Sequence, residues 1–587
     1  MTLKDELSAI AGEAFAAEGL DAGLGAVKAA DRPDLAQFQC NGALAAAKAA
    51  KKNPREIAGA VADRLSARPE FSEVTVAGPG FINLKLTPDF LAARIDALGA
   101  DGRFGGWEKE TPEKIVIDYG GPNVAKPLHV GHLRAGIIGE SLKRIMRFAG
   151  DDVTGDVHLG DWGLQMGQLI SELELRQPDL VYFDPQAEGP FPEEPPISLS
   201  DLEEMYPAAS AACKDDPARA DLARKATKAL QAGRPGYVAL WRHFVTLSVN
   251  AMKKDYADLE VEFDLWKGEA DADPLIPELT EDLKKRGVLE ESDGAEIIRV
   301  AREDDNKEMP PIIFLNSEGA VGYHATDIAT IVDRKRALDP DRILYVVDAR
   351  QRLHFEQVFR AVAKAGYFDE ARLEHLWFGT MNGKDGKPFK TRAGGTLKLR
   401  DLIETVTDKA RERLEENGFA EGYGEAETRE VARQVGVAAL KFADLSNPRT
   451  SDYIFDLDRF MAFEGKTGPY LLYASVRVRS VIAKAKTAGA GEAGPAMLAA
   501  PEEVDLALVL LGFADALRDA YAKRLPHLLC DHAFTLAQTF SKFYAACRIV
   551  DEGDAKLRAS RLALASAVGG QLDLILSLLG FSAPERM

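Results

Sequence analysis

Two histidines three residues apart, His129 and His132, lie where a loop gives way to a helical pattern in PNVAKPLHVGHLRAGIIGESL, residues 122–142. The start of a helix presents unpaired backbone N–H groups and the positive end of the helix dipole, so it attracts anions. Gly131 between the histidines leaves room for a ligand to approach the backbone. This arrangement suits a site for phosphate charge that grows during a reaction. Alternatively, the histidines only cap the helix or fill space.

The elements predicted around the two histidines favour the phosphate site. KIVIDYG (residues 114–120) is a β-branched run typical of a buried strand, and DDVTGDVHLGDWG (151–163) supplies a second strand after the helix. A strand, a crossover helix and a strand form a βαβ unit of a parallel sheet. The same order recurs in residues 342–366. Ligands bind at the carboxyl ends of strands in such sheets, which is where the two histidines lie.

We therefore predict an α/β protein with a doubly wound, parallel-sheet (Rossmann-type) catalytic domain, an N-terminal α+β domain and a C-terminal all-α helical bundle. Residues 74–86 alternate in polarity about a Gly-Pro-Gly turn and predict strands in the N-terminal domain. The predicted boundaries are 1–106 for the N-terminal domain, 107–400 for the catalytic domain with an insertion at about 172–306, 401–460 for a helical connecting region, and 461–587 for the helical bundle.

Composition limits the class of protein. The four cysteines form no CxxC pair, which argues against a disulfide scaffold or a zinc knuckle. The first residues carry acids where a secretory signal would be basic and apolar, and no apolar run is long enough to span a membrane, so we expect a cytoplasmic protein. The net charge of −20 argues by itself against a nucleic-acid partner, but residues 384–400 and 477–486 are locally basic.

Several motifs together resemble one enzyme family. His129-Val130-Gly131-His132 resembles the HIGH signature of class I aminoacyl-tRNA synthetases, and GKDGKPFKTRAGG (383–395) resembles their second, lysine-rich signature in a degenerate form, with Lys387 and Lys390 at matching positions. Longer matches to the arginyl-tRNA synthetases are GPNVAKPLHVGH, HLGDWG, YHATDIAT, DARQRLHFEQVF, LSNPRTSDYIFD and GPYLLYA. The resemblance covers nearly the whole chain.

This resemblance implies ATP-dependent activation of L-arginine to arginyl-adenylate and its transfer to the 3′ terminal adenosine of tRNA(Arg), with bound tRNA needed for the first step. It implies that His129, Gly131, His132 and Lys390 bind ATP, and that Lys126 and Lys387 join the two histidines and Lys390 in catalysis. Mg²⁺ would accompany ATP, because no acidic cluster demands a dedicated protein metal site. A monomer is the family expectation.

A pocket for arginine needs fixed carboxylates and other acceptors, because the guanidinium is planar, permanently charged and has five donors. Candidate side chains follow the predicted strands, and Tyr323 and Asp327 are four residues apart, as on one face of a helix. The resemblance implies arginine contacts by five residues, which are Asp118, Asn123, Tyr323, Asp327 and Gln351. For each acid, a surface salt bridge or a helix cap is the alternative.

Contacts to tRNA are expected in the two flanking domains. Phe81 and Asn83 match positions that read a nucleotide of the D-loop in the family, and the C-terminal region resembles the anticodon-binding domain, where Tyr470, Tyr473 and Arg477 are candidates. Packing in the core is the alternative for the aromatic residues.

Three other functions stay open at this point. Another class I synthetase is one, although the cysteine type would need paired thiolates for zinc. A small nucleotidyltransferase also uses an HxGH sequence but leaves more than 200 C-terminal residues unexplained. A catalytically inactive tRNA-binding paralogue is the third, although both signatures carry chemically capable residues.

Overall fold

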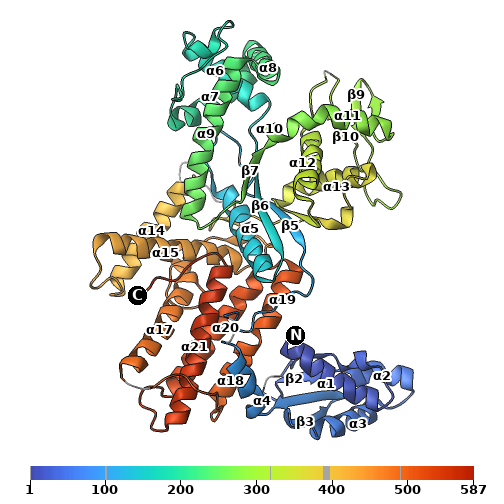
Figure 1. The fold of residues 1–587 in the computed structure, drawn as a ribbon, viewed down its shortest axis with the longest axis vertical. Helices are drawn as coiled ribbons and strands as arrows, with labels where there is room; N and C mark the ends of the chain where they lie inside the picture. Colours follow the sequence, from blue (N-terminus) through green and yellow to red (C-terminus); the bar gives the residue numbers. More distant parts are fainter. Residues whose placement is uncertain (1, 33, 100–101, 318, 388–396, 489–490) are drawn as a thin grey trace. The chain divides into compact units, whose positions relative to one another are not determined.

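The structure is a computed structural model that describes all residues except 1, 33, 100–101, 318, 388–396 and 489–490. The chain forms two compact units (Figure 1). The first unit comprises residues 1–109, 417–423 and 462–587, and the second unit comprises residues 110–416 and 424–461.

A five-stranded parallel sheet lies at the centre of the second unit, in the order β12-β11-β5-β6-β7. The strands are β5 (Lys114–Tyr119), β6 (Asp152–Leu159), β7 (Leu265–Gly268), β11 (Arg342–Val346) and β12 (Leu373–His375). Because β6 and β11 both flank β5, the chain order reverses at the β5–β11 pair. A crevice for ligands opens at the carboxyl ends of the strands at such a point. The predicted doubly wound sheet is confirmed.

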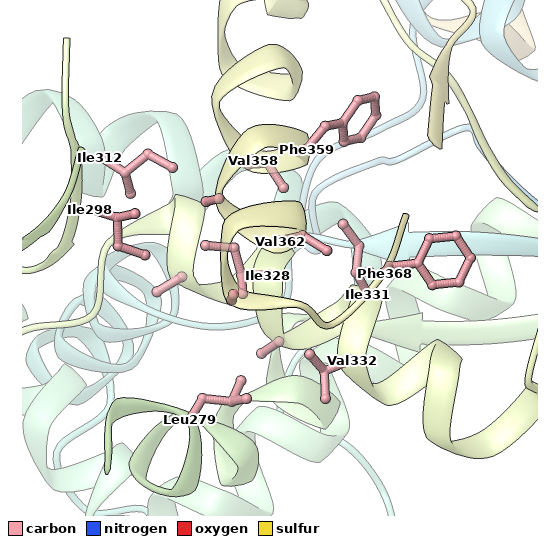
Figure 2. Packing of buried hydrophobic residues seen from close by; sticks show 14 of the residues in the cluster. Leu279, Ile298, Ile312, Ile328, Ile331, Val332, Val358, Phe359, Val362 and Phe368 are labelled. Carbon is pink, nitrogen blue, oxygen red and sulfur yellow. The ribbon is translucent and has the colours of Figure 1, made fainter. Parts of the chain in front are cut away.

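Two helices build a hydrophobic core together with side chains of the parallel sheet. Helix α12 (Tyr323–Leu338) contributes Ile328 and Ile331, and α13 (Arg352–Ala365) contributes Val358 and Val362. These side chains pack with residues of α11 (Ile276–Lys285) and with the antiparallel sheet of β8 (Glu290–Ser292), β9 (Ala295–Ile298) and β10 (Ile312–Leu315) (Figure 2).

Residues 172–306, predicted as an insertion, are mostly helical but also complete the sheet. They follow the start of α6 (Leu164–Arg176) and contain α7 (Leu199–Asp215), α8 (Pro217–Gln231), α9 (Pro235–Asp258), α10 (Glu269–Ala272) and α11. Helices α6 to α9 enclose their own apolar core. The same segment supplies β7, an edge strand paired with β6. The sequence pattern did not reveal this strand.

Helix α5 (Val130–Phe148) crosses from β5 to β6, as predicted. After the sheet come α14 (Leu399–Glu416), α15 (Glu425–Leu445) and α16 (Leu457–Phe460), with a short parallel pair of β13 (Met381–Asn382) and β14 (Tyr453–Ile454). The second unit therefore continues well beyond its sheet.

The first unit combines an antiparallel sheet with a helical bundle. The sheet order is β1-β2-β4-β3, formed by β1 (Val27–Ala29), β2 (Phe38–Cys40), β3 (Phe71–Ala77) and β4 (Phe81–Leu86) with α1 (Leu3–Ala17), α2 (Gly42–Ala50), α3 (Pro54–Ser66) and α4 (Pro88–Ala97). The predicted turn lies between β3 and β4. The bundle is α17 (Gly468–Thr487), α18 (Pro501–Leu511), α19 (Phe513–Lys523), α20 (His527–Ala546) and α21 (Ala555–Leu578).

One helix among the described residues, α21, is long and apolar enough to cross a membrane by length and composition alone. Its apolar window is 61% buried inside the structure, however, and the core helix of a bundle passes the same test.

Candidate active site

His129 and His132 cap the start of α5 with one nitrogen each. The backbone N–H of Gly131 donates to Nδ1 of His129 at 2.9 Å, and the backbone N–H of His129 donates to Nδ1 of His132 at 3.1 Å. The ring centroids lie 4.0 Å apart. A side chain at position 131 would clash, because an added Cβ would lie 2.6 Å from Cε1 of His129. Capping and glycine thus fix the orientation of both rings.

Capping also decides which nitrogen can serve a ligand. An Nδ1 that accepts a backbone N–H carries no proton in a neutral ring, so the proton belongs on Nε2. Burial lowers the pKa of His132 to about 3, with His129 and Lys126 adding to the effect, and burial together with Lys126 also lowers the pKa of His129. Both rings are therefore neutral at pH 7, each with an Nε2–H that can donate to a phosphate oxygen.

Lys126 lies on the loop that leads into α5, half-buried. Its Nζ is 4.6 Å from the centre of the Tyr206 ring, a distance at which a cation is attracted to the aromatic face. The loop is tied to the end of β6, because the Gly160 N–H donates to Pro122 O and the Val124 N–H donates to Gly160 O. The predicted residue Asn123 forms the bridge to Gly160.

The residues that follow the lysine-rich signature lie against the start of α5. His129 pairs with Lys398, the Val130 N–H donates to Leu397 O at 3.2 Å, and the Leu399 N–H donates to Leu128 O at 2.8 Å. Residues 397–399 thus run beside residues 128–130. Lys387 is exposed on a tight turn, in which the Gly383 N–H donates to Lys387 O at 2.8 Å. Lys390 lies outside the described residues.

Asp118 near the end of β5 belongs to a buried ionic cluster. Its Oδ2 accepts from Nη2 of Arg334 at 2.5 Å, and the same guanidinium donates to Oδ2 of Asp156 at 2.8 Å and to the Tyr345 hydroxyl at 3.1 Å. Asp118 lies between Tyr345 and Asp156 in the register of three adjacent strands. Burial raises the pKa of Asp156 against the opposing effect of Arg334. Arg334 thus holds one oxygen of the buried Asp118 carboxylate.

Tyr323 and Asp327 lie one turn apart at the start of α12, as predicted. Asp327 Oδ2 is 2.6 Å from Nε2 of His354 on α13, and the exposed Tyr323 ring stacks on His354 with centroids 4.9 Å apart. The predicted residue Gln351 is exposed at the start of α13. Tyr323 and Asp327 therefore both contact the ring of His354.

Four residues of this region were missed from the sequence. Arg334 lies seven residues after Asp327, a spacing that repeats on one helix face and could have indicated it. His354 lies inside the motif DARQRLHFEQVF, and Asp156 lies two residues before the motif HLGDWG. For Glu269 no local signal exists. Burial, followed by Asp161 and Asp327, raises its pKa to about 7, and burial raises the pKa of Asp161 to about 6.

The described residues contain no group of three or more His, Cys, Asp or Glu side chains that is placed to hold a metal ion.

The two N-terminal RNA candidates lie on β4 of the first unit. Asn83 is 7% exposed, and its Oδ1 accepts from Nε2 of Gln39 on β2 at 3.0 Å. Phe81 is half-buried at the start of the strand. An RNA base would meet Phe81 more readily than the buried Asn83 amide.

Tyr470, Tyr473 and Arg477 share one face of α17, three and four residues apart. Tyr470 packs edge-on against Phe534, and Tyr473 stacks on Phe419 with centroids 5.3 Å apart. Both tyrosines are half-buried, whereas Arg477 is exposed with its guanidinium carbon 5.5 Å from the centre of the Tyr544 ring. This face combines stacking rings with a cation, the combination that RNA-binding surfaces use.

Family models cover almost all of the chain. Residues 95–457 match the catalytic domain of "tRNA synthetases class I (R)", residues 471–587 match the DALR anticodon binding domain, and residues 1–86 match the arginyl tRNA synthetase N terminal domain.

Curated relatives and solved structures agree with the family models. The chain is 55% identical to the arginine–tRNA ligase of Hyphomonas neptunium and 54% identical to that of Maricaulis maris, over the whole of each chain. The fold is similar to the arginyl-tRNA synthetase of Plasmodium falciparum (TM-score 0.82, 24% identity, 100% of this chain and 99% of that chain). It is also similar to the Thermus thermophilus enzyme (TM-score 0.79, 24% identity, the whole of both chains).

Proposed function

Because the chain belongs to the class I arginyl-tRNA synthetases, we infer that it activates L-arginine with ATP and passes the arginyl group to tRNA. The observation that carries this function is the pairing of residues 128–130 with residues 397–399, which brings the chain just after the lysine-rich signature beside the HxGH helix start. An inactive paralogue is not favoured.

The first step needs positioning more than proton transfer. The arginine carboxylate is ionised at neutral pH, so it attacks the α-phosphorus of ATP directly, and the bond from that phosphorus to the pyrophosphate oxygen breaks. Negative charge grows on the phosphate oxygens as this happens. The Nε2–H groups of His129 and His132 are already oriented by their Nδ1 caps, so they donate to this charge without reorganising.

We propose that positive charge at the site comes from three lysines. Lys126 lies on the loop into α5, Lys387 is exposed on the turn at the leading end of the lysine-rich signature, and Lys390 follows it in the sequence. Mg²⁺ comes in with ATP. In the second step, the 3′ terminal adenosine of tRNA(Arg) attacks the adenylate carbonyl and AMP leaves.

We propose that Asp118, Asn123, Tyr323, Asp327 and Gln351 bind arginine. Support comes from the carboxyl-end position of Asp118 and from the pairing of Asp327 with His354, which fixes a carboxylate beside the Tyr323 ring. A carboxylate left without its cation by a wrong amino acid is costly, so such a pocket discriminates strongly.

Further features follow from family membership as proposals. We propose that activation requires bound tRNA, that Phe81, Asn83, Tyr470, Tyr473 and Arg477 contact that tRNA, and that the enzyme works as a cytoplasmic monomer. The predicted boundaries at 106, 400 and 460 stay proposals too. The end of one family-model match at residue 457 and the start of the next at residue 471 support the last of them.

The test is arginine-dependent ATP–pyrophosphate exchange with tRNA(Arg) present. We expect His132→Ala to slow exchange by about 10²-fold or more, because one preorganised donor is lost. His132→Gln, which keeps a donor at similar reach, should retain more activity than His132→Ala. His243→Ala is the control, since His243 bonds to Tyr182 in the helical segment away from the sheet. An unchanged rate in His132→Ala would remove this histidine from the mechanism, and exchange with another amino acid would overturn the substrate.

A further inference from the structure

The second turn of α5 carries an arginine that is buried in an unusual way. The side chain of Arg134, two residues after His132, is 2% exposed, and that of Asp444 on α15 is 1% exposed. Arg134 Nε lies 2.8 Å from Asp444 Oδ2. A buried ion pair contributes little to stability compared with apolar side chains of similar size, because both charges lose their hydration. Its value lies in the geometry that it enforces.

The remaining donors of Arg134 hold the chain that leads into β14. Nη1 donates to Ser451 O at 3.2 Å and Nη2 donates to Arg449 O at 3.4 Å. The guanidinium carbon is also 5.2 Å from the centre of the Tyr453 ring and 5.6 Å from that of Phe378. Arg134 of α5 thus contacts both the segment that leads into β13 and the segment that leads into β14.

The segment held by Arg134 in turn holds the leading end of the lysine-rich signature. Residues 379–382 run beside residues 449–455. The Gly379 N–H donates to Arg449 O at 3.0 Å, the Thr380 N–H donates to Asp452 Oδ1 at 2.6 Å, and the Phe455 N–H donates to Asn382 O at 2.8 Å. An ion pair of 3.1 Å between Lys384 and Asp456 extends the contact. Every link in this chain of contacts lies within the second unit.

Helix α5 therefore contacts the described chain before and after the lysine-rich signature. Its first turn pairs with residues 397–399, which follow the signature, and its second turn reaches residues 379–384, which lead into it, through Arg134 and the β14 segment. The catalytic histidines lie on the first of these turns. A change in the second turn shifts one end of the signature relative to the histidines.

We propose that Arg134 is a positioning residue for adenylate formation. Paired with Asp444, it holds residues 449–453 against α5 and so sets where the lysine-rich signature leaves the β13–β14 pair relative to His129 and His132. This inference rests on the proposed function of those histidines and lysines. It assigns Arg134 no contact with ATP or arginine.

Three variants test the proposal by exchange kinetics and hydrogen–deuterium exchange. Arg134→Lys keeps the charge but loses the planar fork that reaches a carboxylate and two carbonyls at once. Asp452→Ala removes an exposed acceptor for Thr380 N–H and disturbs folding little. Arg147→Lys is the control. Arg147 lies in the last turn of the same helix and pairs with Asp264 at 2.6 Å.

We expect kcat for pyrophosphate exchange to fall about tenfold or more in Arg134→Lys, because small misplacements of catalytic groups are costly, with KM for arginine changed less than about twofold. In Asp452→Ala, kcat for pyrophosphate exchange should also fall, but by a smaller factor. Peptides covering residues 376–384 and 449–456 should exchange deuterium faster in both variants. Arg147→Lys should match the wild type in all three measurements.

Wild-type kcat in folded Arg134→Lys, or a loss of arginine binding as large as the loss of kcat, would overturn the proposal. If Arg134→Lys does not fold, the test rests on Asp452→Ala. Wild-type kcat together with wild-type deuterium exchange in that variant would refute the proposal. An absence of arginine-dependent exchange in the wild type would instead refute the proposed function. The deuterium measurement would still report whether Arg134 fixes the two segments.

Discussion

Single residues in this enzyme serve structure and chemistry with different atoms of one side chain. In His129 and His132, Nδ1 caps the helix and Nε2 is left to meet phosphate. The two interpretations of the HxGH sequence, helix cap and phosphate site, are therefore compatible. In the proposed mechanism, the cap fixes the tautomer of each ring and the direction of its Nε2–H donor. Asp327 is a second example, since His354 contacts one of its oxygens and so orients the carboxylate.

We expect Glu269 to make arginine binding depend on pH. Its pKa is about 7, raised by burial and then by Asp161 and Asp327. A guanidinium bound at Asp327 favours the ionised form of Glu269, so binding releases a proton. Arginine affinity should fall as the pH is lowered from about 7 toward 5, by at most about tenfold per pH unit for one proton. Titration calorimetry across this range measures it.

Variants separate Glu269 from its neighbour. Glu269→Gln should flatten the dependence near pH 7, whereas Asp161→Asn should keep the dependence but shift it to lower pH, because Asp161 helps to raise the pKa of Glu269. Affinity in the wild type that does not change between pH 5.5 and 8 would contradict this account of the pocket.

At the scale of elements, α5 lies so close to β5 that one position admits only glycine. A Cβ added at Gly139 would lie 2.2 Å from Cγ of the buried Tyr119 ring. We expect Gly139→Ala to lower the free energy of unfolding by about 1–3 kcal/mol, the usual cost of overpacking a core. Urea denaturation of the full chain measures the loss.

Gly59 provides the matched control. It also lies within a helix, α3, but an added Cβ meets nothing within 4 Å. Gly59→Ala should raise stability by about 0.5–1 kcal/mol, because alanine loses less backbone entropy in a helix. Equal effects of the two substitutions would show that helix propensity, not the contact with Tyr119, governs position 139.

At the scale of the whole molecule, a chain of net charge −20 must bind a polyanion. We propose that local surfaces resolve the conflict, and the exposed Arg477 on the face of α17 that carries Tyr470 and Tyr473 is the candidate. Arg477→Ala should weaken tRNA(Arg) binding and reduce the salt dependence, d log K/d log[salt], by about one. Filter binding from 50 to 200 mM salt measures both.

The control for this prediction is Arg224→Ala, an arginine on α8 that is 59% exposed and paired with Asp221. It should leave affinity and salt slope unchanged. If Arg477→Ala behaves the same way, the tRNA surface of the first unit lies elsewhere.

Local pattern made several parts of this enzyme predictable from sequence. Strand 114–119, the helix from Val130 and the turn before Phe81 were predicted because alternation, helical period and glycine act over a few residues. Residues 265–268 could not be recognised, because four residues carry too little pattern and become a strand only by pairing with β6.

By itself, the sequence determined the family, the chemistry and the positions of the signature residues, since these depend on residue type and short spacing. Only the tertiary structure decided the partners of those residues. Arg334 meets Asp118 across 216 residues, and Arg134 of α5 meets Asp444 of α15. The physical reason is that a buried charge must find its counter-charge wherever the fold brings one within reach, and no local spacing encodes that distance.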